Sequence, residues 1–238
     1  MEPIHTHISH QFNAELEEIR SKVLQMGGLV EQQIEKAMEA LMTGDTSLGD
    51  EVILGDAKVN HLDVLIDEEC NHIIARRQPA AGDLRLVMAV IKTIADLERI
   101  GDEAEKIAKM AVRLAHEERP KNNYAEVQTL GNHVREMVHS ALDAFARMDI
   151  EAAVTTAHED RKIDQKYDGV MRQMITHMME DPRTITRALD VIWAARALER
   201  IGDHARNICE YIVYLVKGKD VRHTTLEQIE REILGRKE

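Results

Sequence analysis

Asp-Leu-Glu-Arg-Ile-Gly-Asp-Glu-Ala at residues 96–104 and Ala-Leu-Glu-Arg-Ile-Gly-Asp-His-Ala at residues 197–205 are near copies of one segment. The five residues Glu-Arg-Ile-Gly-Asp are identical in both, and the copies stand 101 residues apart. An identity of this length at matched places rarely arises by chance. We infer that the chain contains an internal duplication, which is the sequence signature of a repeat architecture.

Each copy carries two carboxylates four residues apart on one helix face. The pairs are Glu98 with Asp102 and Glu199 with Asp203. A like-charge pair at this spacing costs about 0.2–0.5 kcal/mol when it is exposed, and burial raises the cost. The glycine before each aspartate costs about 1 kcal/mol more than alanine in a helix. The like-charge pair and the mid-helix glycine are both unfavourable, and both occur in each copy. A cation that offsets the carboxylate repulsion is therefore predicted.

A second element of each repeat offers further oxygen ligands. Residues 55–60 resemble residues 159–164, and Asp168 extends the acidic row of the second segment. Oxygen ligands from several helices suit Mg, Mn or Fe better than zinc, which favours His and Cys. The candidate metal ligands are Glu98, Asp102, Glu199, Asp203, Asp160, Asp164, Asp56 and Asn60.

Basic side chains offer an alternative to a metal ion, because they would neutralise the same carboxylates. The sequence provides such partners close to both acidic pairs. In this alternative the acids are hydrated or paired with Arg99, Arg200, Lys106 or Arg206.

Apolar residues recur three or four positions apart through almost the whole chain, which predicts helices and no strand. The first helix shows the pattern most clearly and ends near Thr43-Gly44. Its stripe consists of Phe12, Leu16, Ile19, Val23, Met26, Val30, Ile34, Ala37 and Leu41.

Capping residues and prolines divide the rest of the first half. A second helix is expected over about 47–77, followed by a break that contains Pro79. Asp83 resembles an N-cap, because its short side chain can accept from the free amides of a first turn. The third helix is then expected to end near residue 118, before Pro120.

The second half repeats this division. Asn123 with Glu126 forms a capping pair for a helix over about 123–147. Asp149 caps a fifth helix that is expected to reach about residue 179.

Asp181-Pro182 starts the sixth helix, because proline suits the first helical position. This helix is expected to run to Lys217-Gly218, and Thr224 with Glu227 opens a short final helix. Long helices joined by short loops fold back antiparallel. The sequence therefore predicts an all-α fold of two pseudo-symmetric three-helix bundles, residues 1–119 and 120–238, with a short C-terminal helix.

Composition excludes several classes of function. A net charge of −12 disfavours nucleic acid as the main partner and disfavours an anionic membrane surface. No apolar run approaches the roughly 18 residues that span a bilayer, and the N-terminus lacks an apolar signal core. Cys70 and Cys209 lie singly in apolar stripes, as expected in a reducing compartment. These features predict a cytoplasmic protein that is not inserted in the membrane.

Several of these segments together resemble the PhoU family of bacterial phosphate-transport accessory proteins. The resemblance rests on the two Leu-Glu-Arg-Ile-Gly-Asp segments, on residues 77–85 and on residues 179–185. Residues 143–150 add to it, and the similarity extends from about Ile8 to the C-terminal helix.

The resemblance implies a homodimer with metal bound at Glu98, Asp102, Glu199 and Asp203. It also implies a negative regulator of phosphate uptake and of the phosphate-starvation response (the Pho regulon). In that role the protein couples the ATPase subunit of a phosphate ABC transporter to a membrane histidine kinase of the PhoR type. Asn60 stands where the second repeat has Asp164, so the first metal site is expected to be weaker or differently filled.

Two other classes of function compete with a regulator. A carboxylate-bridged di-metal enzyme would need inward-facing Glu-x-x-His pairs. The pairs Glu69 with His72 and Glu136 with His139 are expected at the surface, away from the apolar stripes. No phosphate-binding loop or nucleophile motif is present. We therefore expect no enzyme activity, and a purely structural helical scaffold remains the other alternative.

Overall fold

The computed structural model describes residues 4–117, 124–221, 224 and 228, with side chains from residue 10 onward. Within these residues every regular element is helical. The elements are α1 (Ile4–Thr43), α2 (Thr46–Arg77), α3 (Ala81–Leu114), α4 (Ala125–Arg147), α5 (Ile150–Ala157), α6 (Asp160–Glu180), the 3₁₀ turn η1 (Pro182–Thr184) and α7 (Ile185–Lys217).

Local signals set the first two helix boundaries as predicted. Gly44 follows α1 with a φ of 78°, a left-handed conformation that favours glycine. Asp45 then caps α2 by accepting from the backbone N–H groups of Ser47 and Leu48. These two residues turn the chain through a tight corner, so α2 returns alongside α1.

The predicted start and end of the third helix are wrong. Ala80 is the N-cap of α3 and makes no side-chain cap bond. Asp83 lies in the first turn, where the helix dipole favours its charge without a capping role. The left-handed backbone of Ala81 (φ 42°) turns the chain early, so the N-cap lies three residues sooner than predicted. Its other end is at Leu114, several residues before the predicted stop.

The predicted fifth helix is also wrong, because the structure divides it into α5 and α6. Asp149 caps α5 as expected, by accepting from the backbone N–H of Ala152. The chain then turns at His158 and Glu159. The Glu159 carboxylate accepts from His133 Nε2 of α4 at 2.7 Å. This contact between helices outweighs the helical periodicity that continues through the turn.

The remaining boundaries agree with expectation where the structure describes them. Asp181 caps η1 through the backbone N–H of Arg183. Tyr124 occupies the N-cap of α4, while the predicted cap at Asn123 lies outside the described residues. The predicted domain boundary at 119/120 and nearly all of the short C-terminal helix also lie outside them.

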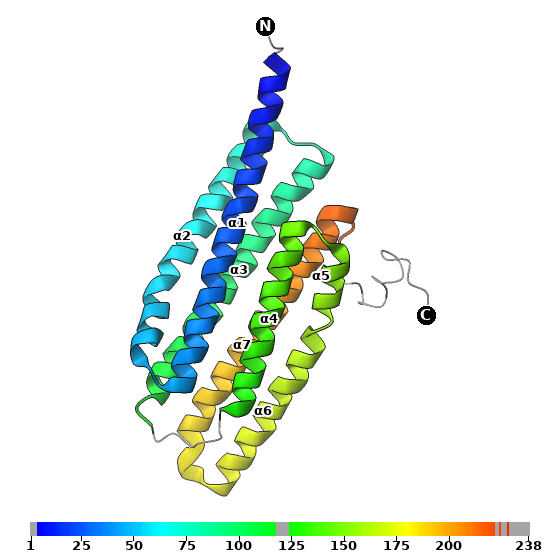
Figure 1. Cartoon of the computed structure of the whole chain (residues 1–238). Coiled ribbons are helices and arrows are strands. Elements are labelled where there is room, and N and C mark those ends of the chain that lie inside the picture. The colour runs from blue at the N-terminus through cyan, green and yellow to red at the C-terminus, as the bar shows by residue number, and fades with distance from the viewer. Residues whose placement is uncertain (1–3, 118–123, 222–223, 225–227, 229–238) are drawn as a thin grey trace.

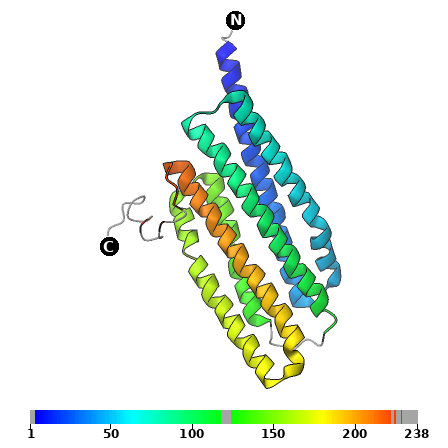
Figure 2. The same ribbon diagram turned by 180° about the vertical axis from the view of Figure 1, so that it is seen from behind.

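The helices form two three-helix bundles that lie side by side. One bundle contains α1, α2 and α3, and the other contains α4, α7 and the α5–α6 pair (Figure 1). From behind, α3 and α7 lie together in the centre, with α2 and α6 on their outer sides (Figure 2). Buried apolar residues form one continuous core through both bundles. The acidic segments of α3 and α7 therefore lie where the bundles meet.

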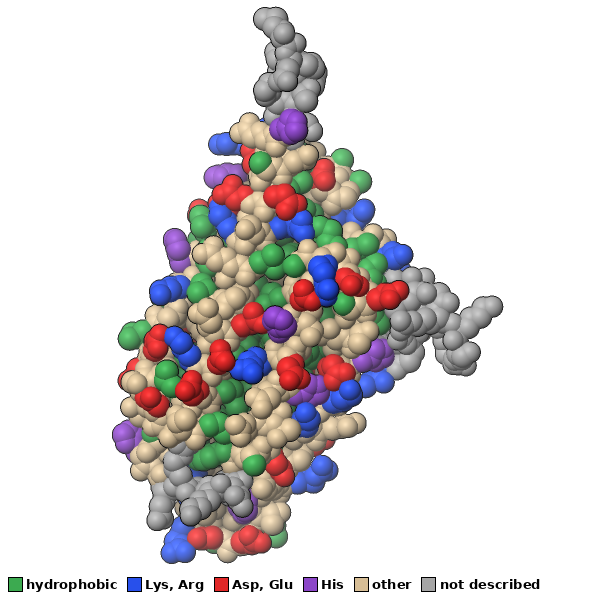
Figure 3. All heavy atoms as spheres, viewed as in Figure 1, with side chains coloured by type: hydrophobic (Ala, Val, Ile, Leu, Met, Phe, Trp, Pro, Cys, Tyr) green, Lys and Arg blue, Asp and Glu red, His purple; other side chains and the backbone are tan. Residues whose placement is uncertain are grey.

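The side of the molecule that carries α1 and α4 shows mixed charge rather than a basic surface (Figure 3). Acidic and basic side chains are interspersed over the side that carries α1 and α4 (Figure 3). Among the described helices, none combines the length and the apolar character needed to cross a bilayer.

Candidate functional site

The first acidic cluster lies between α2 and α3 and contains Asp56, Glu98 and Asp102. Asp56 is 7% exposed, although it carries a carboxylate. Its Oδ1 accepts from Gln33 Nε2 of α1 at 3.3 Å, and its Oδ2 accepts from Asn60 Nδ2 at 2.9 Å. Two neutral amides therefore hold the most buried acid of this cluster.

Burial and mutual repulsion make the charged form of this cluster unfavourable. Burial raises the pKa of Asp56, with Asp102 adding repulsion. Burial also raises the pKa of Glu98, and the charges of Asp102, Asp63 and Asp56 add to this shift. Asp63 thus belongs to the electrostatic surroundings of the cluster, although the sequence did not single it out. Its place seven residues after Asp56, on the same helix face, was the available signal.

The second cluster lies between α6 and α7 and contains Asp160, Asp164, Glu199 and Asp203. Asp160 is 4% exposed and lies at the first residue of α6. Asp164 and Asp203 are exposed, and Glu199 is half-buried. Asp168, the last acid of the predicted row, is exposed as well.

Arginines neutralise part of this second cluster. Arg206 Nη1 donates to Asp160 Oδ2 at 3.2 Å, and Arg196 Nη1 donates to Glu199 Oε1 at 2.5 Å. The alternative of arginine partners is therefore correct here for Arg206, and Arg196 was not predicted. Its place three residues before Glu199 was the local signal that could have identified it.

Some carboxylate oxygens of the second cluster stay unsatisfied. Asp160 Oδ1 and Glu199 Oε2 are buried and have no hydrogen-bond partner among the described residues. Burial raises the pKa of Asp160 and of Glu199. The pKa of Asp203 is raised by partial burial and by the charge of Asp164. These orphaned acceptors fit the oxygen chemistry that a hard cation requires.

The mid-helix glycines of the duplicated segment allow close approach of α2 and α6. A Cβ on Gly101 would lie 3.1 Å from both Asp56 Oδ1 and Gln33 Oε1. A Cβ on Gly202 would lie 3.1 Å from Ile163 Cδ1. Both contacts are tighter than ordinary packing, so a side chain at either position would crowd the neighbouring helix, which explains why glycine occurs there. The nearest atoms nevertheless differ, because Gly101 meets two oxygens first, whereas Gly202 meets two carbons of Ile163 before Asp160 Oδ1 at 3.7 Å.

The structure brings the predicted acids together as two clusters rather than as one patch. Within the described residues, no three His, Cys, Asp or Glu side chains stand in an arrangement that could hold a metal ion. Bound metal would therefore require these carboxylates to rotate toward one another. The donor chemistry fits, but the metal assignment stays a prediction.

The surface assignment of the Glu-x-x-His pairs is confirmed. His72, Glu136 and His139 are exposed, and Glu69 is half-buried against Lys22 of α1. His139 Nδ1 lies 2.8 Å from a carboxylate oxygen of Glu31, also on α1. Among the side chains that the structure describes, no inward-facing pair of this type is available to build a di-metal oxidase centre.

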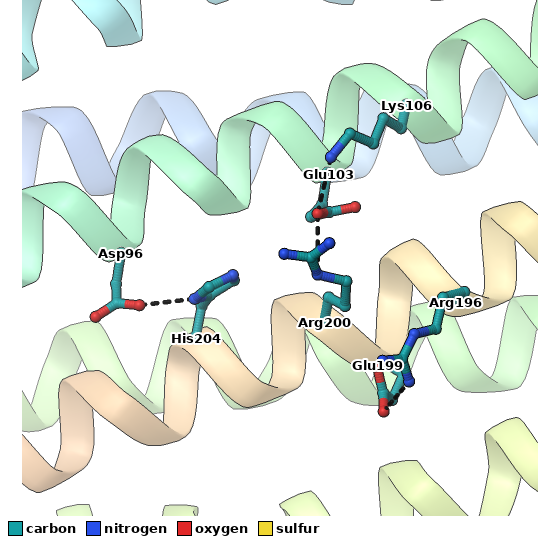
Figure 4. Close-up of polar contacts among 7 residues, drawn as sticks. All are labelled: Asp96, Glu103, Lys106, Arg196, Glu199, Arg200 and His204. Atoms are coloured by element: carbon teal, nitrogen blue, oxygen red, sulfur yellow. Dashed lines mark hydrogen bonds and ion pairs between the residues drawn. The ribbon is translucent and has the colours of Figure 1, made fainter.

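A separate group of polar residues joins α3 to α7 (Figure 4). His204 Nδ1 lies 2.7 Å from Asp96 Oδ1, and both side chains are buried. Glu103, 3% exposed, contacts Arg200 of α7 at 3.2 Å and Lys106 of its own helix at 2.9 Å. His204 therefore faces the other bundle and not the acidic cluster beside it.

Comparison with known proteins places this arrangement in a family. A model of the PhoU domain matches residues 23–111 and residues 127–212, one match in each bundle. A Pseudomonas putida homolog of the phosphate-specific transport system accessory protein PhoU is 54% identical over 229 residues, which cover 96% of this chain and 90% of that protein. The Escherichia coli K12 protein of that name is 50% identical over 234 residues, covering 98% and 96%.

Solved structures agree with the sequence comparison. The crystal structure of PhoU from Pseudomonas aeruginosa superposes with a TM-score of 0.85 at 51% identity, covering 87% of this chain and all of that one. The phosphate transport system regulatory protein PhoU from Streptococcus pneumoniae gives a TM-score of 0.82 at 30% identity, covering 88% and 99%. Matched in both repeats and over nearly its full length, the chain belongs to the PhoU family.

Proposed function

We propose that this protein is an accessory regulator of a phosphate-specific transport system. In this role it limits phosphate uptake and keeps the phosphate-starvation response off while phosphate is plentiful. The observation that carries the proposal is similarity over 96–98% of the chain to proteins named as accessory proteins of that system. Both duplicated acidic segments lie within the matched regions.

We infer that the protein works as an adaptor in the cytoplasm. Its partners in this proposal are the ATPase subunit of the phosphate ABC transporter and a membrane histidine kinase of the PhoR type, and it acts as a homodimer. Two bundles that share one core suit a role in which separate faces contact separate proteins.

We propose further that the protein has no catalytic activity of its own. Both cysteines are buried, and burial raises the pKa of the Cys70 thiol to about 12. Burial raises the pKa of Cys209 as well. Thiolates are the nucleophilic form, so these residues are suited to packing and not to covalent chemistry.

Metal binding is the finer part of the proposal. The carboxylates of Glu98, Asp102 and Asp56 would hold a hard ion such as Mg²⁺, Mn²⁺ or iron between α2 and α3. Those of Glu199, Asp203, Asp160 and Asp164 would do the same between α6 and α7. A bound cation supplies positive charge that offsets carboxylate repulsion. In each repeat the two helices contribute the oxygen ligands, and their packing sets the distance between the carboxylates of one helix and those of the other.

Deletion of the gene tests the regulatory role directly. With ample phosphate, the deletion strain is expected to express phosphate-scavenging genes constitutively, measured as alkaline phosphatase activity and as uptake of labelled phosphate. Restoring the intact gene should return both to the repressed level. Repression that persists after deletion would refute the regulatory proposal.

Removing one carboxylate from each cluster tests the metal contribution. The combined variant Glu98→Ala with Glu199→Ala is expected to lose bound metal and to restore repression poorly. Metal content is measured by elemental analysis of untagged protein purified without chelators. Unchanged metal content and full repression would favour a purely structural helical scaffold. Oxygen-dependent optical bands from bound iron would instead favour a di-metal enzyme.

A further inference from the structure

The two acidic clusters differ in the charges that the chain places around them. The acidic segments of α3 and α7 correspond with an offset of 101 residues. With that offset, Arg196 corresponds to Ala95, and Arg206 corresponds to Glu105. The two arginines that neutralise Glu199 and Asp160 therefore have no basic equivalent in the first repeat.

The position of Glu105 strengthens this contrast. It is half-buried on the face of α3 that carries the cluster, and its own partner is Lys109, one turn further along. No ion pair from a basic residue to Asp56, Glu98 or Asp102 is found among the described residues. Within the part of the chain that the structure describes, the first cluster thus has no basic partner, whereas the second cluster has two arginines, although Asp160 Oδ1 and Glu199 Oε2 of the second cluster stay without a hydrogen-bond partner.

A neutral oxygen ligand is also present in the first cluster alone. Gln33 of α1 is 7% exposed, and its Oε1 is buried without a hydrogen-bond partner among the described residues. Its Oε1 and Asp56 Oδ1 both lie over Gly101, the residue before Asp102, each 3.1 Å from where a Cβ would stand. An unpaired buried amide oxygen is unfavourable unless a partner satisfies it.

The second repeat has an apolar residue at the equivalent place. The core stripes of α1 and α4 correspond with an offset of 104 residues, as Val30 and Ile34 match Val134 and Val138. Gln33 then corresponds to Met137, which is buried and offers no oxygen.

From these differences we propose that the first cluster is the principal cation site, with Gln33 Oε1 as a ligand supplied by α1, whereas Arg196 and Arg206 occupy the role of the cation in the second cluster. The proposal rests on the metal binding proposed above and adds which cluster binds and through which extra residue. It reverses the expectation that Asn60 weakens the first site. Amide oxygens of Gln33 and Asn60 beside three carboxylates form a ligand set suited to Mg²⁺ or Mn²⁺.

A titration with Mn²⁺ tests the proposal, followed by electron paramagnetic resonance of free Mn²⁺ with chelator-washed full-length protein. The intact chain is expected to bind one Mn²⁺ tightly. Asp102→Asn should abolish this site, and Asp203→Asn should leave it unchanged. Gln33→Met, which copies the second repeat, should weaken binding by about tenfold or more, as loss of supporting ligands commonly does.

Matched controls separate ligand loss from general damage. Gln32→Met changes an exposed neighbour on α1 and should bind like the intact chain. Gln33→Glu keeps a carbonyl-type oxygen and should retain binding. Bound Mn²⁺ should also broaden the side-chain amide NMR signals of Gln33, a readout that does not depend on how the variants fold.

The second cluster provides the reciprocal experiment. Replacing Arg196 with Ala and Arg206 with Glu copies Ala95 and Glu105, and is expected to raise the stoichiometry from one Mn²⁺ to two. Two equivalent sites in the intact chain, loss of the site in Asp203→Asn, or unbroadened Gln33 signals would overturn this inference while leaving metal binding intact. Absence of any Mn²⁺ binding would instead overturn the proposed metal binding itself.

Discussion

Where α1 meets α4, the two repeats exchange equivalent contacts. Gly27 and Gly131 occupy the same position of their repeats, as do Met38 and Leu142. A Cβ on Gly27 would lie 2.7 Å from Leu142 Cδ2, and a Cβ on Gly131 would lie 2.7 Å from Met38 Sδ. Each glycine thus receives the side chain of the opposite repeat. The duplicated chain packs against itself as the subunits of a symmetric dimer do.

The repeats diverge where polar residues decide the structure. The first repeat has an unbroken α2, while the second divides the same stretch into α5 and α6. Glu159 at the break is held by His133 and by Lys162. The division also places Asp160 at a helix start, where the dipole favours negative charge, whereas Asp56 lies within α2. The spacing of apolar residues therefore gives both repeats the same three-helix bundle, whereas polar contacts make the two bundles differ in detail.

Proline substitution should reveal this difference most strongly. Ala57 lies inside α2, so Ala57→Pro removes a helical hydrogen bond and should lower the free energy of unfolding by about 3 kcal/mol or more. Arg161 is its equivalent in the first turn of α6, where proline is better tolerated, and Arg161→Pro should cost clearly less. Urea unfolding measures both variants. Equal losses of unfolding free energy would mean that the break before α6 does not make proline more acceptable at residue 161 than at residue 57.

The exchanged glycine contacts should respond unequally to alanine. Gly27→Ala forces Leu142, a branched side chain, to move and should destabilise the protein by about 1–3 kcal/mol. Gly131→Ala meets only the flexible end of Met38, which can shift, so the loss should be smaller. Thermal unfolding of the two variants provides the comparison. Gly28→Ala, where a Cβ meets nothing within 4 Å, is the control and should stabilise the helix.

Periodicity was sufficient to predict the bundles because the buried apolar residues of the helices recur three or four positions apart. Local chemistry also predicted the caps at Asp149 and Asp181, since each side chain bonds to a nearby amide. The break at Glu159 could not be predicted in this way, because its partner His133 lies on another helix.

The candidate site shows the same limit. Its carboxylates could be predicted because i and i+4 residues share a helix face whatever the fold. Gln33 could not, because it reaches Asp56 only after α1 packs against α2. The buried contact between Asp96 and His204 depends likewise on the register of α3 against α7.

The two polar contacts across α3 and α7 should differ in strength. Asp96 accepts from His204 and from Asn207 Nδ2 at 3.1 Å, so His204→Ala leaves a buried carboxylate with one partner. We expect a loss of about 1–2 kcal/mol. Arg200→Ala should cost less than about 1 kcal/mol, because Glu103 keeps Lys106 and Arg200 is partly exposed. Denaturant unfolding of both variants tests this order, and a larger loss for Arg200→Ala would contradict it.

The smallest expected effect concerns the charge of the first cluster. Burial and the neighbouring charge of Asp102 raise the pKa of Glu98, so the folded chain binds this proton more tightly than the unfolded chain. The stability contributed by protonated Glu98 is present below the ordinary glutamate pKa. It is lost as the pH rises through the raised folded value. At neutral pH the metal-free protein therefore carries the full repulsion between Glu98 and Asp102.

Removing that repulsion should stabilise the protein in a pH-dependent manner. In chelator-treated protein, Glu98→Gln should raise the free energy of unfolding by about 0.2–0.5 kcal/mol at neutral pH, the scale of a like-charge pair on a helix. The gain should shrink as the pH falls toward 4, because native Glu98 is then protonated too. Unfolding curves across this range measure the effect, with exposed Glu68→Gln as a control. With Mn²⁺ present the sign should reverse, because the same carboxylate then stabilises the folded protein as a ligand.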